Sequence, residues 1–275
     1  MCELQNRNTG VEGLTQISAR LEAAVRDAGA LARSMFGAPL KNWTKGPTLS
    51  PVSEADIAVD DLLRARLTAG DDGIAWLSEE SADDRKRLSA RYVWIVDPID
   101  GTRAYIASFP DWAVSAALVD NGRPIAACLY APVTEQFFTA RANAGASCNG
   151  MAIAATKGAQ LEGARIAGPR NLLERLTAVA PPFTVMPRVR SLALRLAQVA
   201  NGACDVAFAG GNSHDWDLAA ADLLVHEAGG ALTSITGGAV TYNRPVPRHG
   251  MLVAAGRDRH AALIELLGDG RLAFS

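Results

Sequence analysis

Residues 94–102, Trp-Ile-Val-Asp-Pro-Ile-Asp-Gly-Thr, join an apolar run to two carboxylates and then to a glycine-threonine turn. The apolar run predicts a buried strand, and because proline cannot donate a ladder hydrogen bond, we expect the strand to end at Pro98. Asp97 and Asp100 would then lie on the loop at its carboxyl end. The backbone N–H groups of the glycine and threonine that follow are placed to donate hydrogen bonds to phosphate oxygens. Carboxylates for hard cations beside amides for an anion indicate metal-assisted phosphate chemistry.

Two further acidic segments accompany this one. Ser-Glu-Glu-Ser at 78–81 comes before it, and Asp-Trp-Asp-Leu-Ala-Ala-Ala at 215–221 comes after it, followed by Glu-Ala-Gly-Gly at 227–230. In this order and at these separations, the segments resemble the signature of the inositol monophosphatase superfamily, which includes 3'(2'),5'-bisphosphate nucleotidases. The resemblance extends from about Lys45 to about Gly256, and it implies a phosphoric monoester hydrolase.

The resemblance also implies a mixed α/β fold, the layered α-β-α-β-α sandwich of these phosphatases, with the active site between two halves. We place an N-terminal α+β subdomain, with an antiparallel sheet and most metal ligands, at residues 1–157. A C-terminal α/β subdomain at 158–275 would contribute Asp217 and substrate contacts. The predicted elements are compatible with two sheets layered with helices. They are helices at 14–35, 53–70, 192–199, 218–228 and 261–267, and strands at 74–77, 92–96, 112–119, 124–130, 136–140, 147–152, 205–209 and 251–255.

Magnesium prefers oxygen ligands in a near-octahedral shell, and the acidic segments supply such ligands. Matching the family residue by residue gives a set that would hold two or three Mg²⁺ ions. The set consists of the carboxylates of Glu79, Asp97, Asp100 and Asp217 and the backbone carbonyl of Ile99. One such acid in a loop is usually solvated, but acids after an apolar strand or beside Trp216 are unlike surface residues.

The resemblance assigns further roles near these ligands. Thr102 would orient the attacking water, Glu79 would accept its proton, and Asp56 would support Thr102 and a third ion. Lys45 matches a family lysine near the site. The substrate phosphate would lie against Asp100, Asp217 and the amides of Gly101 and Thr102. Glu80 is left open between a supporting residue and the surface, and His214 and Asp215 are left open between the site and the cap of the following helix.

The substrate is suggested by a departure from the family. Relatives that use inositol phosphates commonly carry a glutamate seven residues before Asp217, where it contacts sugar hydroxyls, and this chain has Gly210 there. Arg188 and Arg190 precede the helix that follows Ser191, and arginines suit a second phosphate, although these could also be surface charges. We therefore favour a 3'-phosphoadenosine 5'-phosphate type of bisphosphate over inositol 1-phosphate, with histidinol phosphate third.

A catalytically silent binding or regulatory protein on the same fold is the alternative from another class, because fold alone does not secure activity. Against it, every acid expected of an active member is present. Nucleotide-binding kinases and dehydrogenases are weaker rivals, since no Gly-x-x-x-x-Gly-Lys-Ser/Thr or Gly-x-Gly-x-x-Gly segment occurs. The resemblance also implies inhibition by lithium. Because relatives are often dimers, it also implies a homodimer.

Composition excludes other classes. The chain has 275 residues, 49% of them apolar, and a formal net charge of −2, so it gives no electrostatic footprint for a nucleic acid polymer. No apolar stretch approaches the roughly 20 residues of a membrane-spanning helix, and residues 1–7 lack the character of a signal peptide, so we expect a cytoplasmic protein without a membrane partner. The four cysteines form no Cys-x-x-Cys pair and are expected to be reduced.

Overall fold

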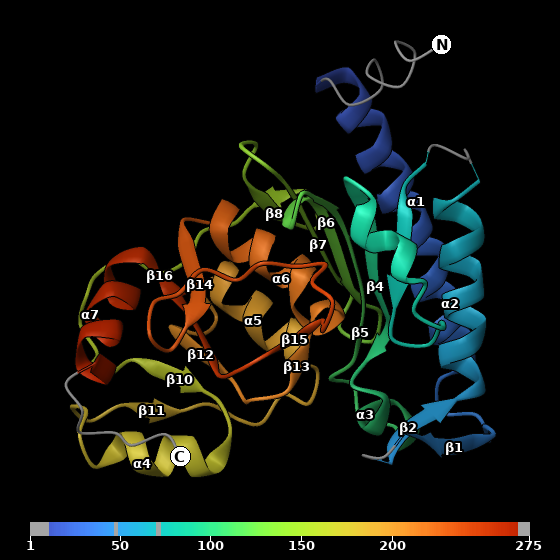
Figure 1. Ribbon diagram of the computed structural model, residues 1–275. Helices are drawn as coiled ribbons and strands as arrows, with labels where there is room; N and C mark the ends of the chain where they lie inside the picture. The colour runs from blue at the N-terminus through green and yellow to red at the C-terminus, as the bar shows by residue number, and fades with distance from the viewer. Residues whose placement is uncertain (1–10, 47–48, 70–72, 269–275) are drawn as a thin grey trace.

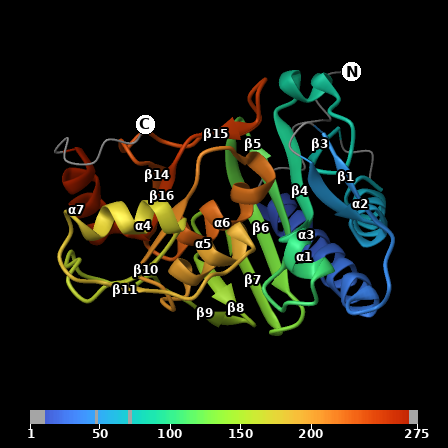
Figure 2. The ribbon, with the colours of Figure 1, turned by 90° about the horizontal axis from the view of Figure 1, so that it is seen from below.

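The computed structural model describes residues 11–46, 49–69 and 73–268, and these form five layers in the order helix, sheet, helix, sheet, helix (Figures 1 and 2). The predicted α-β-α-β-α sandwich is confirmed. The three helical layers are α1 (Val11–Met35) with α2 (Glu54–Leu67), then α5 (Leu192–Ala200) with α6 (Asp215–Glu227), then α4 (Arg170–Thr177) with α7 (Arg257–Gly268). A short helix, α3 (Thr102–Ile106), and a 3₁₀ turn at Arg85–Ser89 lie outside these layers.

The two sheets separate the helical layers. The first has seven strands in the order β3-β4-β5-β6-β7-β8-β9, and the second has five in the order β11-β10-β12-β16-β14. Strands of the first sheet are β3 (Ala75–Ser78), β4 (Tyr92–Asp100), β5 (Ala113–Asp120), β6 (Arg123–Ala131), β7 (Gln136–Arg141), β8 (Ala146–Cys148) and β9 (Met151–Ala152). Strands of the second are β10 (Arg165–Ala167), β11 (Thr184–Val185), β12 (Val206–Ala209), β14 (Gly230–Ser234) and β16 (Leu252–Gly256). Two small ribbons pair β1 (Asn42–Lys45) with β2 (Ser50–Ser53), and β13 (Ser213–His214) with β15 (Arg248–His249).

Strand β4 is apolar along its length because both of its faces are covered. Trp94 and Val96 pack with the residues of α1 and α2, whereas Val93 and Ile95 pack with those of α5 and α6. Successive side chains of a strand point to opposite faces, so a strand between two helical layers needs apolar residues at every position. Strand β4 is thereby fixed at both faces, and its carboxyl end lies next to the middle helical layer.

The turn signals of the first sheet are confirmed in one place and corrected in another. Asn121 and Gly122 have φ angles of 46° and 79° and join β5 to β6 as the predicted tight hairpin. The single strand expected at 147–152 is wrong. Asn149 and Gly150 also have positive φ and form a turn, which divides the segment into β8 and β9.

Helix α6 begins earlier than the sequence suggested. It starts at Asp215 rather than at residue 218, with His214 as its N-cap, so that Asp217 occupies the third position of its first turn. The apolar pattern of 218–228 could not reveal this start, because the first turn is acidic. Helix α2 follows Ser53 in a capping box, as its Ser-x-x-Asp spacing predicts, and ends at Leu67.

The first sheet is built from residues 75–152 and the second from 165–256. The division into subdomains at residue 157 stays a prediction. Cys128, Cys148 and Cys204 are free thiols, and Cys2 lies outside the described residues. Among the helices of the described ranges, none is both long and apolar enough to cross a bilayer.

Candidate functional site

Three carboxylates from two parts of the chain meet between the first sheet and the middle helical layer. Ligand oxygens of Asp97, Asp100 and Asp217 all lie within 4.8 Å of one another. Asp97 and Asp100 come from the end of β4, and Asp217 comes from the first turn of α6. The expectation that Pro98 ends the strand and leaves Asp97 and Asp100 on a loop is wrong. Strand β4 continues through the proline to Asp100.

A β-bulge explains both the proline and the convergence of the acids. Asp97 pairs with Ser115 and Asp100 pairs with Ala113, so three steps along β4 match two steps along β5. Pro98 is tolerated because a bulge interrupts the ladder of hydrogen bonds. In a regular strand, residues three apart point to opposite faces; the extra residue of the bulge brings both carboxylates to the same side.

Asp217 is held by the helix start it occupies. Its Oδ2 atom accepts a hydrogen bond from the backbone N–H of His214 at 2.6 Å, and the positive end of the α6 dipole favours a carboxylate there. Of the two flanking residues left open by the sequence, His214 is the N-cap, and its ring stacks on Trp216 with centroids 4.6 Å apart. Asp215 points away from the cluster, since its carboxylate binds His249 at 2.7 Å.

Glu79 follows β3 and lines the same pocket as the three aspartates. Its backbone carbonyl accepts a hydrogen bond from the Lys45 ammonium at 2.9 Å, and Lys45 also forms an ion pair with Glu80 at 2.7 Å. Burial lowers the pKa of Lys45, but the charges of Glu79 and Glu80 outweigh this and raise it above its usual value. Glu80 is therefore a buried partner of Lys45 and not a surface residue.

Asp60 holds the loop that carries Glu79, and sequence reasoning missed it. Its two carboxylate oxygens accept hydrogen bonds from the hydroxyls of Ser78 and Ser81, one on each side of Glu79. Asp60 is four residues after Asp56 in α2, a spacing that places both on one helical face. That spacing, together with the serines on both sides of Glu79 and Glu80, was the available signal.

Thr102 and Asp56 are in direct contact, as their predicted roles require. The Thr102 hydroxyl lies 3.0 Å from Asp56 Oδ1 and 3.1 Å from the carbonyl oxygen of Ile99, either of which can accept its single proton. Asp56 also accepts hydrogen bonds from the backbone and hydroxyl of Ser53. Burial raises the pKa of Asp56, although these hydrogen bonds oppose the rise.

Asp100 joins the metal-ligand candidates to the middle helical layer. Its Oδ2 atom accepts hydrogen bonds from the Ser191 hydroxyl and the backbone N–H of Ala193, at the start of α5. Gly101 follows with a φ of 94°, and a Cβ atom there would lie 3.2 Å from the carbonyl oxygen of Asp111. Glycine is needed at 101 for both its backbone conformation and this close approach.

A pocket of about 420 Å³ opens over these groups. It is lined by acids and arginines together: Glu79, Asp97, Asp100 and Asp217 with Arg103, Arg188 and Arg190, and with Ser50, Pro51, Gly101 and Thr102. Arg190 already has partners, because its guanidinium contacts Asp111 at 3.1 Å and lies 3.7 Å from the Phe109 ring centroid. Gly210 does not line this pocket; its nearest non-neighbouring atom, measured from an ideal Cβ position, is in Pro169.

The electrostatics of the cluster call for a cation. Burial and mutual repulsion raise the pKa values of Asp97 and Asp217 well above their usual range, and burial raises that of Asp100 against its hydrogen bonds. Burial, opposed by Lys45 and reinforced by neighbouring acids, raises the pKa of Glu79 to about 7. Such a group of ionised acids is unfavourable alone and favourable around a divalent ion. The residues present therefore fit a hard divalent metal.

The same repulsion predicts how stability depends on pH. Carboxyl groups whose pKa is raised by folding bind more protons in the folded state than in the unfolded state. The free energy of unfolding is therefore highest below about pH 4, where these groups are protonated in both states, and it falls as the pH rises through about 7. In EDTA, we expect the melting temperature to fall between pH 5 and pH 8, by about 2–4 °C for each kcal/mol lost. Magnesium should restore it more at pH 8 than at pH 5. Thermal melts with EDTA or magnesium measure this, and a magnesium effect independent of pH would contradict it.

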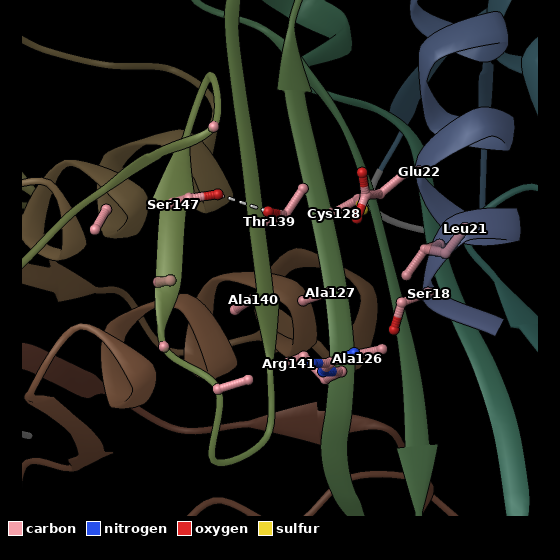
Figure 3. Close-up of a pocket in the computed structure, with 15 residues that line it drawn as sticks. Ser18, Leu21, Glu22, Ala126, Ala127, Cys128, Thr139, Ala140, Arg141 and Ser147 are labelled. Carbon is pink, nitrogen blue, oxygen red and sulfur yellow. Dashed lines mark hydrogen bonds between the residues drawn. The ribbon is translucent and has the colours of Figure 1, made fainter. Parts of the chain in front are cut away.

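A second hollow of about 380 Å³ lies between α1 and strands β6 to β8, and it contains none of the candidate residues (Figure 3). Ser18, Leu21 and Glu22 of α1 face Cys128 and its neighbours there. Glu22 is the one carboxylate among its lining residues. The pocket of about 420 Å³ thus differs from this hollow in having a cluster of carboxylates in its lining.

Comparisons with known proteins agree with the geometry. The model of the inositol monophosphatase family matches residues 14–270. An inositol monophosphatase of Dictyostelium discoideum is 30% identical over 78% of this chain and 83% of its own length. A histidinol-phosphatase of Mycobacterium tuberculosis is 36% identical over 76% of this chain and 84% of its own length. A Nus factor SuhB of Xylella fastidiosa is 38% identical, but the match spans only 56% of that protein.

The fold is also found among solved structures. The extragenic suppressor protein suhB of Bartonella henselae superposes with a TM-score of 0.79 and 28% identity, over 92% of this chain and 98% of that one. The chain therefore belongs to the inositol monophosphatase family and is, like the phosphatases among its relatives, a phosphoric monoester hydrolase.

Proposed function

We propose that this protein is a magnesium-dependent phosphomonoesterase that hydrolyses a small-molecule phosphate and prefers a 3'(2'),5'-bisphosphate nucleotide. The observation that supports it most is the pocket in which four carboxylates and three arginines face one space. Carboxylates suit magnesium, and arginines suit a substrate with more phosphate charge than one ester carries.

Two or three Mg²⁺ ions would be held by Glu79, Asp97, Asp100, Asp217 and the carbonyl of Ile99. Bound there, they would lower the pKa of the attacking water and neutralise the phosphate and the departing oxygen. Magnesium is preferred over softer metals because every proposed ligand is an oxygen.

The remaining residues would position the reactants. With its hydroxyl donating to Asp56, Thr102 keeps lone pairs free to accept a hydrogen bond from the attacking water. Glu79 would take a proton from that water while the water oxygen bonds to phosphorus and the ester P–O bond breaks. The amides of Gly101 and Thr102 would bind phosphate oxygens, and Lys45 would keep the loop of Glu79 and Glu80 in place.

Inositol 1-phosphate is the second candidate, favoured by the 30% identical inositol monophosphatase. Histidinol phosphate is the third, favoured by the 36% identical histidinol-phosphatase. Its leaving group carries an ammonium at neutral pH, which Arg103, Arg188 and Arg190 would repel. The acids retained in the cluster argue against a catalytically silent protein.

Phosphate release from a panel of substrates tests the proposal. With magnesium, we expect the highest kcat/KM for 3'-phosphoadenosine 5'-phosphate, then inositol 1-phosphate, then histidinol phosphate, and inhibition by millimolar lithium. Greater turnover of either monophosphate would overturn the preference, and no turnover of any of the three would overturn the proposal. We also propose a homodimer, on resemblance alone; light scattering at the 28.9 kDa of one chain would contradict it.

A further inference from the structure

A larger cavity lies next to the pocket of the acids. We call it the α4–α5 cavity, because it lies among the start of α4, strand β11 and helix α5. It measures about 550 Å³. Arg188 lines both this cavity and the pocket of the acids, so the two are adjacent through one side chain. A substrate bound by its phosphate at the acids therefore has space for its leaving group in this direction.

The lining of the α4–α5 cavity suits a flat apolar group. Its apolar side chains come from α4, from the residue before it and from the segment that follows it: Pro169, Leu173, Val185, Met186, Pro187 and Val189. Val185, which is 56% exposed, leaves part of this apolar wall open to solvent. Ligand sites commonly combine such apolar walls with a few polar groups that fix orientation.

The polar groups of this lining are mainly cationic. They include Arg170, Arg188 and Arg195, against the single carboxylate of Glu174, and Glu174 already forms an ion pair with Arg170 at 2.8 Å. Within the described residues, no carboxylate lies within ion-pair distance of Arg188 or Arg195. Two guanidinium groups therefore line the cavity without an ion pair of their own.

Arg195 shows this most clearly. Its Nε atom is buried and has no hydrogen-bond partner among the described residues, and a buried donor left unsatisfied is unfavourable. Burial lowers the pKa of its guanidinium, and the positive charge of Arg188 lowers it further. The negative charge of Asp100 acts in the opposite direction. An arginine remains charged in any case, so an anion in the cavity would relieve both the missing hydrogen bond and the repulsion from Arg188.

We propose that the α4–α5 cavity holds the leaving group of the substrate, an aromatic nucleoside whose second phosphate is bound by Arg188 and Arg195. This inference rests on the proposed function and specifies it: the apolar walls bind the base, and the two arginines recognise the phosphate that is not hydrolysed. Because guanidinium groups bind phosphate through paired hydrogen bonds, selectivity for a bisphosphate over a monophosphate should depend on both.

The first test compares adenosine 3',5'-bisphosphate with adenosine 3'-phosphate, which lacks the second phosphate. Hydrogen bonds to charged groups contribute about 1.5–3 kcal/mol, so we expect Arg188→Gln and Arg195→Gln each to lower the ratio of the two kcat/KM values by about tenfold or more. Arg257→Ala, an exposed arginine on α7, is the control and should keep the wild-type ratio. A wild-type ratio near one, or an unchanged ratio in both glutamine variants, would overturn the inference.

The second test separates this inference from the proposed function. Binding of adenosine 5'-phosphate is measured by calorimetry in EDTA, where no hydrolysis occurs. We expect binding to the wild type and a Kd at least about tenfold weaker in Arg195→Gln and in Leu173→Glu, with melting curves confirming that both variants fold. If no phosphate ester is hydrolysed with magnesium but this binding pattern is seen, the proposed function fails and the cavity assignment stands. Absence of binding, or equal Kd values in wild type and Arg195→Gln, would overturn the cavity assignment.

Discussion

Replacing Asp97 by asparagine is expected to lower kcat/KM on the order of 10³-fold or more. Asp97 is 1% exposed, and the charges of Glu79, Asp100 and Asp217 all act on its carboxyl group, so it is the acid that would be most affected by a bound metal. A catalytic metal is worth several kcal/mol of transition-state charge stabilisation, and each 1.36 kcal/mol corresponds to about a factor of ten. Steady-state kinetics at saturating magnesium measure the loss.

The same substitution should stabilise the metal-free protein. Asparagine removes one of the repelling carboxyl groups at almost constant volume, so the Asp97→Asn variant should melt at a higher temperature than the wild type in EDTA at pH 8. Asp61→Asn, at an exposed position of α2, is the matched control and should change neither property. Activity within tenfold of wild type in Asp97→Asn would contradict the role of Asp97 as a metal ligand.

Replacing Glu79 by glutamine is expected to lower kcat by about 10²–10⁴-fold, the usual contribution of a general base. Glutamine keeps an oxygen for the metal but cannot accept a proton, so kcat should fall more than magnesium affinity does. The loop should keep its place, because Asp60 and Lys45 hold it through Ser78, Ser81 and backbone atoms.

The measurements are kcat at saturating magnesium and the magnesium concentration at half-maximal rate. Glu265→Gln, an exposed position of α7, is the control. A Glu79→Gln variant whose full activity returns at high magnesium would show that Glu79 is only a ligand and not the base.

The buried strand, its two acids and the hairpin after it could be predicted because they are recorded in local patterns, whereas the five layers were implied by the resemblance. The continuous apolar run before Asp97 corresponds to a strand covered on both faces, and the Asn-Gly at 121–122 encodes its own hairpin. Asp217 could be placed near the other acids only through the resemblance, since it lies 117 residues after Asp100 and no local pattern encodes that contact.

Other features could not be predicted because they depend on tertiary pairing. Pro98 normally ends a strand, and only the pairing with β5 reveals the bulge that keeps it in the sheet. Arg190 looked like a free phosphate ligand in the sequence, yet Asp111 and Phe109 already bind its guanidinium. Arg195 sits inside an apolar helical pattern that gave no sign of a cavity beside it.

A crystal structure grown with manganese, with the ion located by its anomalous scattering and magnesium distances refined in a matched crystal, tests the central claim most directly. We expect at least one ion at about 2.1 Å from carboxylate oxygens of Asp97, Asp100 and Asp217, with Glu79 on the same ion or the next. A crystal soaked in millimolar manganese with no peak among these residues, or with its peaks only on unrelated surface acids, would contradict the proposed metal centre.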